Sequence, residues 1–135
     1  MNLDRRRFLA SSAALAATTL LPFGRLLAAG RKITIGAIYV GANDDYGYNQ
    51  AHAQAVAALK VLPGVTVIEQ ENVPETAAVQ KVMEAMIVED EVDMIFVTSF
   101  GYFSHAVKLA PKYPEILFAH CGGLWQQGKD PGNVG

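Results

Sequence analysis

Four apolar runs alternate along the chain with segments of helical periodicity, and this alternation restricts the fold more than any other feature. Strands separated by helices form parallel sheets through right-handed crossovers, with helices on both faces. The first run is too continuously apolar for a half-exposed strand, which predicts burial on both of its faces. We therefore expect an α/β fold with a doubly wound parallel sheet. The four runs are KITIGAIYV (32–40), GVTVIEQE (64–71), VDMIFVTS (92–99) and EILFAHC (115–121).

Three segments between and beside these runs repeat apolar residues at the spacing of a helix. We expect each stripe to face the sheet. The stripes are Ala51, Ala55, Ala58, Leu59 and Leu62; Val79, Val82, Met83, Met86 and Ile87; and, in a shorter helix, Tyr102, Ala106 and Leu109.

The polar and aromatic residues that could bind a ligand cluster directly after the predicted strands. In a doubly wound sheet, ligands bind outside the carboxyl ends of the strands. The sequence therefore predicts a ligand site built from these connections. They are Gly41–Asn49, Asn72–Glu75, Thr98–Ser104 and Cys121–Trp125.

The first connection combines acids, aromatic rings and amides. Asp44 and Asp45 could accept hydrogen bonds from a ligand, or could simply cap the helix that follows. Tyr48 could stack on a flat heterocycle while Asn49 and Gln50 bind its polar rim. Capping needs no aromatic residue, so this corner favours ligand binding.

The connection after the third strand, TSFGYFSH (98–105), supplies a second cluster of aromatic rings and hydroxyls. Gly101 permits close approach of the backbone, and the following helix start could hold an anion or a carbonyl oxygen. A phosphate-binding loop needs more glycine and a lysine, which this loop lacks.

Metal binding and catalysis find little support. His52, His105 and His120 lack the spacing of metal ligands, and Ser99 lacks the glycine frame of a nucleophile elbow. A receiver domain would need an acceptor aspartate near Thr98, where the chain has none. We expect no metal, no cofactor and no enzymatic activity.

Residues 1–29 have the pattern of an export signal. Arg5-Arg6-Arg7-Phe8-Leu9 resembles a twin-arginine signal, and the uncharged segment that follows is short for a membrane span. Four of the 11 Lys and Arg and one of the 13 Asp and Glu lie in this signal, so residues 30–135 carry 7 basic and 12 acidic residues, a net charge of −5. That charge argues against a nucleic-acid partner.

Four motifs, GANDDYGYNQAH, ENVPE, DMIFVTSFGYFSHAVKLAPKYPEILFAH and GNVG, resemble in order and spacing the basic membrane protein (Bmp) family. This family comprises solute-binding proteins of ABC transporters that capture purine nucleosides or bases. The resemblance implies a periplasmic-binding-protein type 1 fold, in which two α/β lobes close on the ligand. It also implies that residues 30–135 form only the N-terminal lobe, as in a truncated member.

The resemblance also implies site residues. Asp45 matches the family's acid, and Tyr48 stands where an aromatic ring stacks on the base. Ser104 replaces an aspartate that takes ribose hydroxyls in nucleoside binders, which favours a nucleobase. The remaining matched positions are Asn49, Gln50, His52, Ser99, Phe100, Gly101 and Tyr102.

The sequence thus predicts a periplasmic receptor for a purine base or nucleoside that delivers its ligand to an ABC permease in the membrane. Three alternatives stay open: an exported ligand-sensing receptor subunit, a remnant that does not bind alone, and an exported purine-processing hydrolase.

Overall fold

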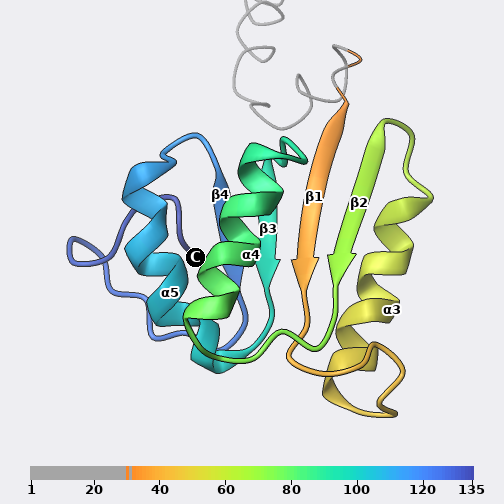
Figure 1. The fold of residues 1–135 in the computed structure, drawn as a ribbon. Helices are drawn as coiled ribbons and strands as arrows, with labels where there is room; N and C mark the ends of the chain where they lie inside the picture. The colour runs from red at the N-terminus through yellow and green to blue at the C-terminus, as the bar shows by residue number, and fades with distance from the viewer. Residues whose placement is uncertain (1–29, 31) are drawn as a thin grey trace, which may run out of the picture. The chain divides into compact units, whose positions relative to one another are not determined.

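The residues that the structure describes form one parallel β-sheet. The structure, a computed structural model, describes Gly30 and residues 32–135, so the predicted export signal over 1–29 lies outside the described residues. The sheet order is β2-β1-β3-β4, and the carboxyl ends of all four strands lie along one edge, the lower edge in Figure 1. This confirms the predicted parallel α/β sheet. The strands are β1 (Ile33–Ile38), β2 (Val65–Gln70), β3 (Met94–Val97) and β4 (Leu117–His120).

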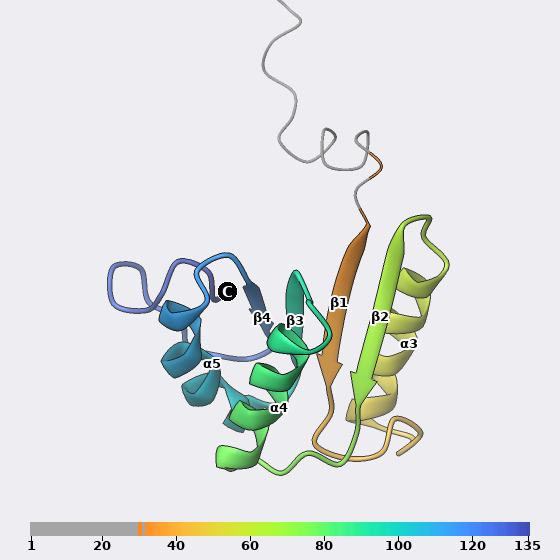
Figure 2. The same cartoon turned by 45° about the horizontal axis from the view of Figure 1, so that its top comes forward.

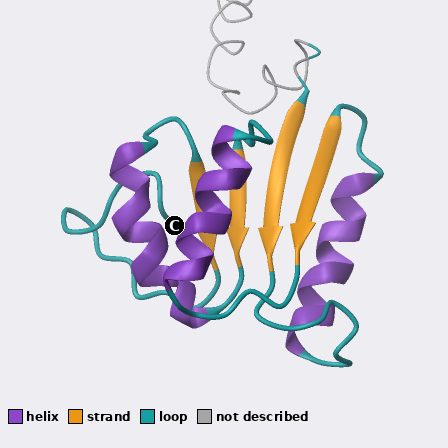
Figure 3. Ribbon diagram, in the orientation of Figure 1, coloured by secondary structure: helices purple, strands orange, loops and turns teal. Residues whose placement is uncertain are grey.

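Helices cover both faces of the sheet, as predicted (Figures 1, 2 and 3). The helix α3 (Tyr48–Lys60) lies on one face, and α4 (Ala77–Val88) and α5 (Phe103–Leu109) lie on the other. Short 3-10 turns, η1 (Phe100–Tyr102) and η2 (Ala110–Lys112), flank α5. Within the described part of the chain, no helix combines the length and apolarity that crossing a membrane requires.

Alternating residues of the central strands build two separate cores. Ile38 packs with the buried residues of α4 and α5, whereas its neighbours Ala37 and Tyr39 pack with Val56 of α3. This alternation is the two-residue period of a strand. Ala37 and Ile38 of β1 and Tyr39 directly after it are fully buried, which confirms that the first strand is covered on both faces.

The predicted stripe is correct for α4 and wrong for α3. In α4, Val79, Met83 and Met86 are buried. In α3, the structure buries Asn49 and Val56, whereas Ala51, Ala55 and Ala58 are exposed. Small alanine side chains are distributed around most of this helix, so their spacing cannot distinguish its buried face from its exposed face.

The last residues of the chain run alongside β4. Val134 pairs with Phe118 in a parallel bridge. The side-chain amide of Asn133 connects this segment to the residues that precede β4. It lies 2.9–3.1 Å from three carbonyl oxygens, those of Ala110, Tyr113 and Ile116.

Candidate ligand-binding site

The strand order places a topological switch point between β1 and β3, and we call the space outside the carboxyl ends of these two strands the crevice. After β1 the chain turns to α3 on one face, and after β3 it turns to α5 on the other. The two connections diverge there, and such divergence points are where open α/β sheets bind ligands. The site was predicted at this edge of the sheet.

Tyr48 spans this crevice. It is the first residue of α3, and its hydroxyl donates a 2.5 Å hydrogen bond to the carbonyl oxygen of Thr98, directly after β3. The His52 ring meets the Tyr48 ring in a T-shaped contact with centroids 4.6 Å apart. Burial of the hydroxyl, followed by its interaction with the Cys121 thiol, raises the pKa of Tyr48 to about 12. The residue nevertheless remains 48% exposed, so an aromatic side chain is held in a fixed position at the crevice.

Asp45 caps α3. Its carboxylate accepts hydrogen bonds from the backbone N–H groups of Gln50 at 3.0 Å and Gly47 at 2.8 Å, and from the side-chain amide of Asn49 at 2.8 Å. These bonds, the Gln50 N–H first, lower the pKa of Asp45 to about 2. The capping role weighed in the sequence analysis is therefore present, and Asp45 remains exposed to solvent, as does Asp44.

Asn49 and Gln50 occupy the first turn of α3 in different environments. Asn49 is only 6% exposed, and among the described residues its Oδ1 atom has no hydrogen-bond partner. Its Nδ2 atom would lie 2.8 Å from a Cβ added at Gly41, so glycine permits the close approach of these two segments. Gln50 is half-buried.

The connection after β3 is held by a carboxylate that the sequence analysis did not identify as a site residue. Glu75, in the turn before α4, accepts hydrogen bonds at Oε1 from the Ser99 hydroxyl and from the Gly101 N–H, the latter at 2.9 Å. A Cβ at Gly101 would lie 2.5–2.8 Å from that carboxyl group, which explains why glycine stands there. These bonds, the Ser99 bond first, lower the pKa of Glu75.

The other predicted residues of this connection lie in different environments, two at the surface and one in the core. Phe100 is 67% exposed beside the crevice, and Ser104 is exposed on α5. Tyr102 instead belongs to the core, since it is fully buried and its hydroxyl donates to the carbonyl oxygen of Val73. The structure does not place the Tyr102 side chain where a ligand could reach it, because the helical spacing it shares with Ala106 turns it inward.

A cavity of about 290 Å³ adjoins Tyr48. Three of its lining residues contact or neighbour the Tyr48 side chain: His52, Thr98 and Cys121. The sequence analysis located these strand ends but named no cavity, since a cavity depends on segments distant in the chain. The full lining is His52, Phe96, Thr98, Ala119, His120 and Cys121.

His120 presents a defined tautomer beside this cavity. Its Nε2 atom lies 2.8 Å from the Ser99 carbonyl oxygen, which can only accept, so Nε2 carries the proton. Burial lowers the pKa of His120 and favours the neutral ring. The Nδ1 atom is then an acceptor, and it has no partner among the described residues.

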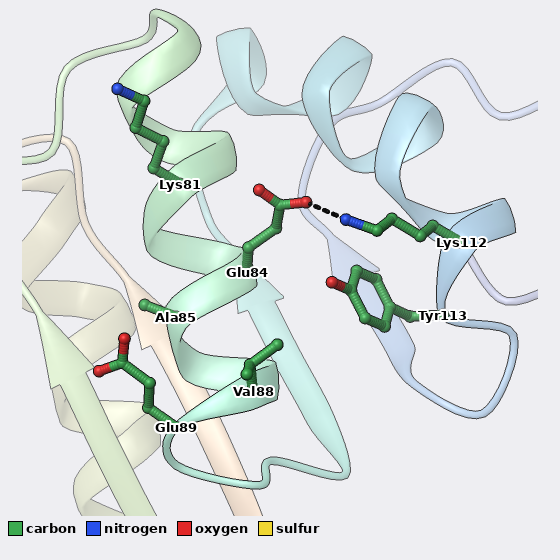
Figure 4. Close-up of a pocket in the computed structure, with 7 residues that line it drawn as sticks. All are labelled: Lys81, Glu84, Ala85, Val88, Glu89, Lys112 and Tyr113. Atoms are coloured by element: carbon green, nitrogen blue, oxygen red, sulfur yellow. Dashed lines mark hydrogen bonds and ion pairs between the residues drawn. The ribbon is translucent and has the colours of Figure 1, made fainter.

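A larger cavity, of about 380 Å³, lies elsewhere (Figure 4). Glu84 on α4 and Lys112 on η2 form a 2.7 Å ion pair across it. The second half of α4 and the residues before β4 lie toward the amino ends of the strands. This cavity is therefore separate from the candidate site.

No group of three or more His, Cys, Asp or Glu side chains within the described residues is arranged to hold a metal ion. The candidate site consists instead of an aromatic ring, backbone carbonyls, amides and an imidazole. Such groups bind a small organic ligand through stacking and hydrogen bonds.

Comparison with known proteins assigns the chain to a family. The family model described as ABC transporter substrate-binding protein PnrA-like (Bmp) matches residues 32–135. The chain belongs to the Bmp family. The match covers all four strands and every residue of the candidate site. It confirms the resemblance seen in the motifs.

A purine-binding protein from Brucella abortus (strain 2308) is 36% identical to this chain over 94 residues. That match covers 68% of this chain and 27% of the relative. The chain therefore spans about a quarter of the length of this relative.

Two solved solute-binding proteins of ABC transporter systems share the fold. The protein from Aeropyrum pernix K1 is 26% identical, with a TM-score of 0.61 over 76% of this chain and 27% of its own. The protein from Conexibacter woesei DSM 14684 is 16% identical, with a TM-score of 0.56 over 64% of this chain and 28% of its own. The fold is that of ABC solute-binding proteins.

Proposed function

We propose that this chain provides one lobe of an ABC-transporter solute receptor that captures a purine base or nucleoside in the periplasm. Capture occurs by stacking and hydrogen bonding, without a chemical step. The receptor delivers its ligand to a permease in the membrane. The proposal includes export through residues 1–29 by the twin-arginine route.

The observation that carries this proposal is the position of Tyr48. Its hydroxyl donates to the carbonyl oxygen of Thr98, and the residue remains 48% exposed at the crevice. A purine is flat and can stack on this ring, at a gain of about 1–3 kcal/mol per stacked base. The purine-binding relative supports this choice of ligand.

The polar residues around Tyr48 complete the proposed recognition. Gln50, at the start of α3, and the exposed Asp44, in the loop before it, could bind the N–H groups of a base, whereas the Oδ1 atom of Asn49 is buried. The exposed Phe100 supplies a second aromatic surface beside the loop after β3. Ser104 offers a hydroxyl in place of a carboxylate, which favours a base over a nucleoside.

Calorimetric titration of residues 30–135 with adenine, hypoxanthine, adenosine and guanosine tests the proposal, after circular dichroism has verified folding. We expect Tyr48→Phe to retain affinity within about twofold, since the stacking ring remains. We expect Tyr48→Ala to weaken binding by about tenfold or more. Tyr46→Ala is the matched control, because Tyr46 is 94% exposed and lies two residues away.

Two results would contradict the proposal. A folded chain that gives no heat with any of the four purines would show that this lobe does not bind alone. Equal losses in Tyr48→Phe and Tyr48→Ala would show that an aromatic ring at position 48 does not by itself provide the ligand contact. Fractionation tests the export step, which fails if the chain is found only in the cytosol.

A further inference from the structure

The segment from Glu71 to Glu75 lies against both connections that border the crevice. Sheet order β2-β1-β3 forces this path, because the chain that leaves β2 for α4 and β3 must pass the carboxyl end of β1. The segment therefore runs along the edge at which a ligand would bind. Its two carboxylates are separated by only three residues.

The first carboxylate holds the connection after β1. The Glu71 Oε2 atom accepts a 2.8 Å hydrogen bond from the backbone N–H of Asn43. The N–H of Asn72 donates to the Gly41 carbonyl oxygen at 3.2 Å, and Asn72 adopts a positive φ of 56°. Two successive residues of the segment thus fix the loop that leads into α3.

The second carboxylate holds the connection after β3. Glu75 accepts at one oxygen atom from the Ser99 hydroxyl and the Gly101 N–H. Both donors belong to the loop that carries the exposed Phe100. Glu75 therefore fixes this loop in the same way that Glu71 fixes the loop after β1.

The middle of the segment is anchored in the core. Val73 is 4% exposed, its N–H donates to the Tyr39 carbonyl oxygen at 3.0 Å, and its carbonyl oxygen accepts from the Tyr102 hydroxyl. Because Val73 is buried and hydrogen-bonded, the backbone at Glu71 and Glu75 on either side of it cannot shift independently of the sheet. The distance between the two loops is consequently set by one short stretch of backbone.

We propose that the Glu71–Glu75 segment is the positioning element of the crevice, which fixes both ligand-facing loops at their separation. Glu71 and Glu75 act as positioning residues, since their bonding partners are loop groups. The consequence for ligand affinity rests on the proposed function. The positioning of the loops does not rest on the proposed function, so it can be measured without a ligand.

Amide hydrogen exchange of the full chain, measured by NMR, tests this. Glu75→Ala removes both bonds to the loop after β3, so the Gly101 amide should exchange about tenfold faster. Glu71→Ala should accelerate the Asn43 amide and leave Gly101 unchanged. Glu75→Gln keeps an acceptor oxygen in the same place and should restore slow exchange at Gly101.

Two controls separate positioning from a general loss of stability. Glu115→Ala removes an exposed carboxylate before β4 and should change neither amide. The amides of Ile38 and Ile95, in the central strands, should exchange as in the unchanged protein in every variant. Faster exchange at Ile38 and Ile95 together with Gly101 would overturn the proposal, because it would show that Glu75 acts on the whole fold.

Purine titration of the same variants then separates this inference from the proposed function. We expect Glu75→Ala to lose about tenfold in affinity and Glu75→Gln to recover it. Faster Gly101 exchange with unchanged affinity would overturn the role in ligand binding. If the unchanged protein binds no purine, the proposed function fails, and the Gly101 and Asn43 exchange rates alone decide whether the segment positions the loops.

Discussion

The Tyr102 hydroxyl offers a direct test of the boundary between core and ligand site. Tyr102 is fully buried, and its hydroxyl donates to the carbonyl oxygen of Val73. Val73 is only 4% exposed. Tyr102→Phe keeps the ring and leaves this buried carbonyl oxygen without its donor. Removing one partner of a buried hydrogen bond costs about 1–3 kcal/mol. For a domain of this size, that corresponds to a fall in Tm of roughly 5–20 °C.

Urea unfolding followed by circular dichroism measures this loss. Tyr46→Phe is the matched control, because the same oxygen atom is removed from a side chain that is 94% exposed, and its free energy of unfolding should change by less than about 0.5 kcal/mol. Purine affinity should be unchanged in Tyr46→Phe, whereas Tyr102→Phe also removes one of the bonds that anchor Val73. Equal stability of the two variants would refute the reasoning.

Two further predictions concern the capping acid and the core. The lowered pKa of Asp45 means that its contribution to stability is complete above its unfolded value of about 3.9 and is lost as the pH falls toward about 2. Acid titration of α3 by circular dichroism should therefore show less loss of helix over this range in Asp45→Asn than in the control Asp44→Asn, and identical curves would contradict the capping role. Met83→Ala should lower the free energy of unfolding by about 2–5 kcal/mol because Met83 is fully buried in α4. Val88→Ala, at a position 65% exposed on the same helix, should have little effect in urea unfolding, and a similar loss in both would show that burial does not set the cost.

The sequence predicted a site at the carboxyl edge of the sheet, but it did not show which of the predicted residues face the core. Tyr48 was named from its position after a buried strand, and the structure places its ring at the crevice. Tyr102 was named from the same kind of position, yet it faces the core. Both are tyrosines next to a helix start, and only the packing of that helix distinguishes them.

The contacts of Glu75 were not predicted, for a related reason. Its partners Ser99 and Gly101 lie 24 and 26 residues further along the chain. Local periodicity carries no information about a contact over that separation. The contact exists because β2 and β3 end at the same edge, with β1 between them.

The sequence by itself determined the strands, the helices and the parallel sheet, because alternating apolar runs and helical stripes are local patterns that burial imposes on any chain of this class. It also determined the buried face of α4, whose large side chains lie on one side. Only the tertiary structure decided which face of the alanine-rich α3 is buried, which tyrosine lines the crevice and which carboxylates hold its loops. Those outcomes depend on contacts between segments that the folded sheet brings together.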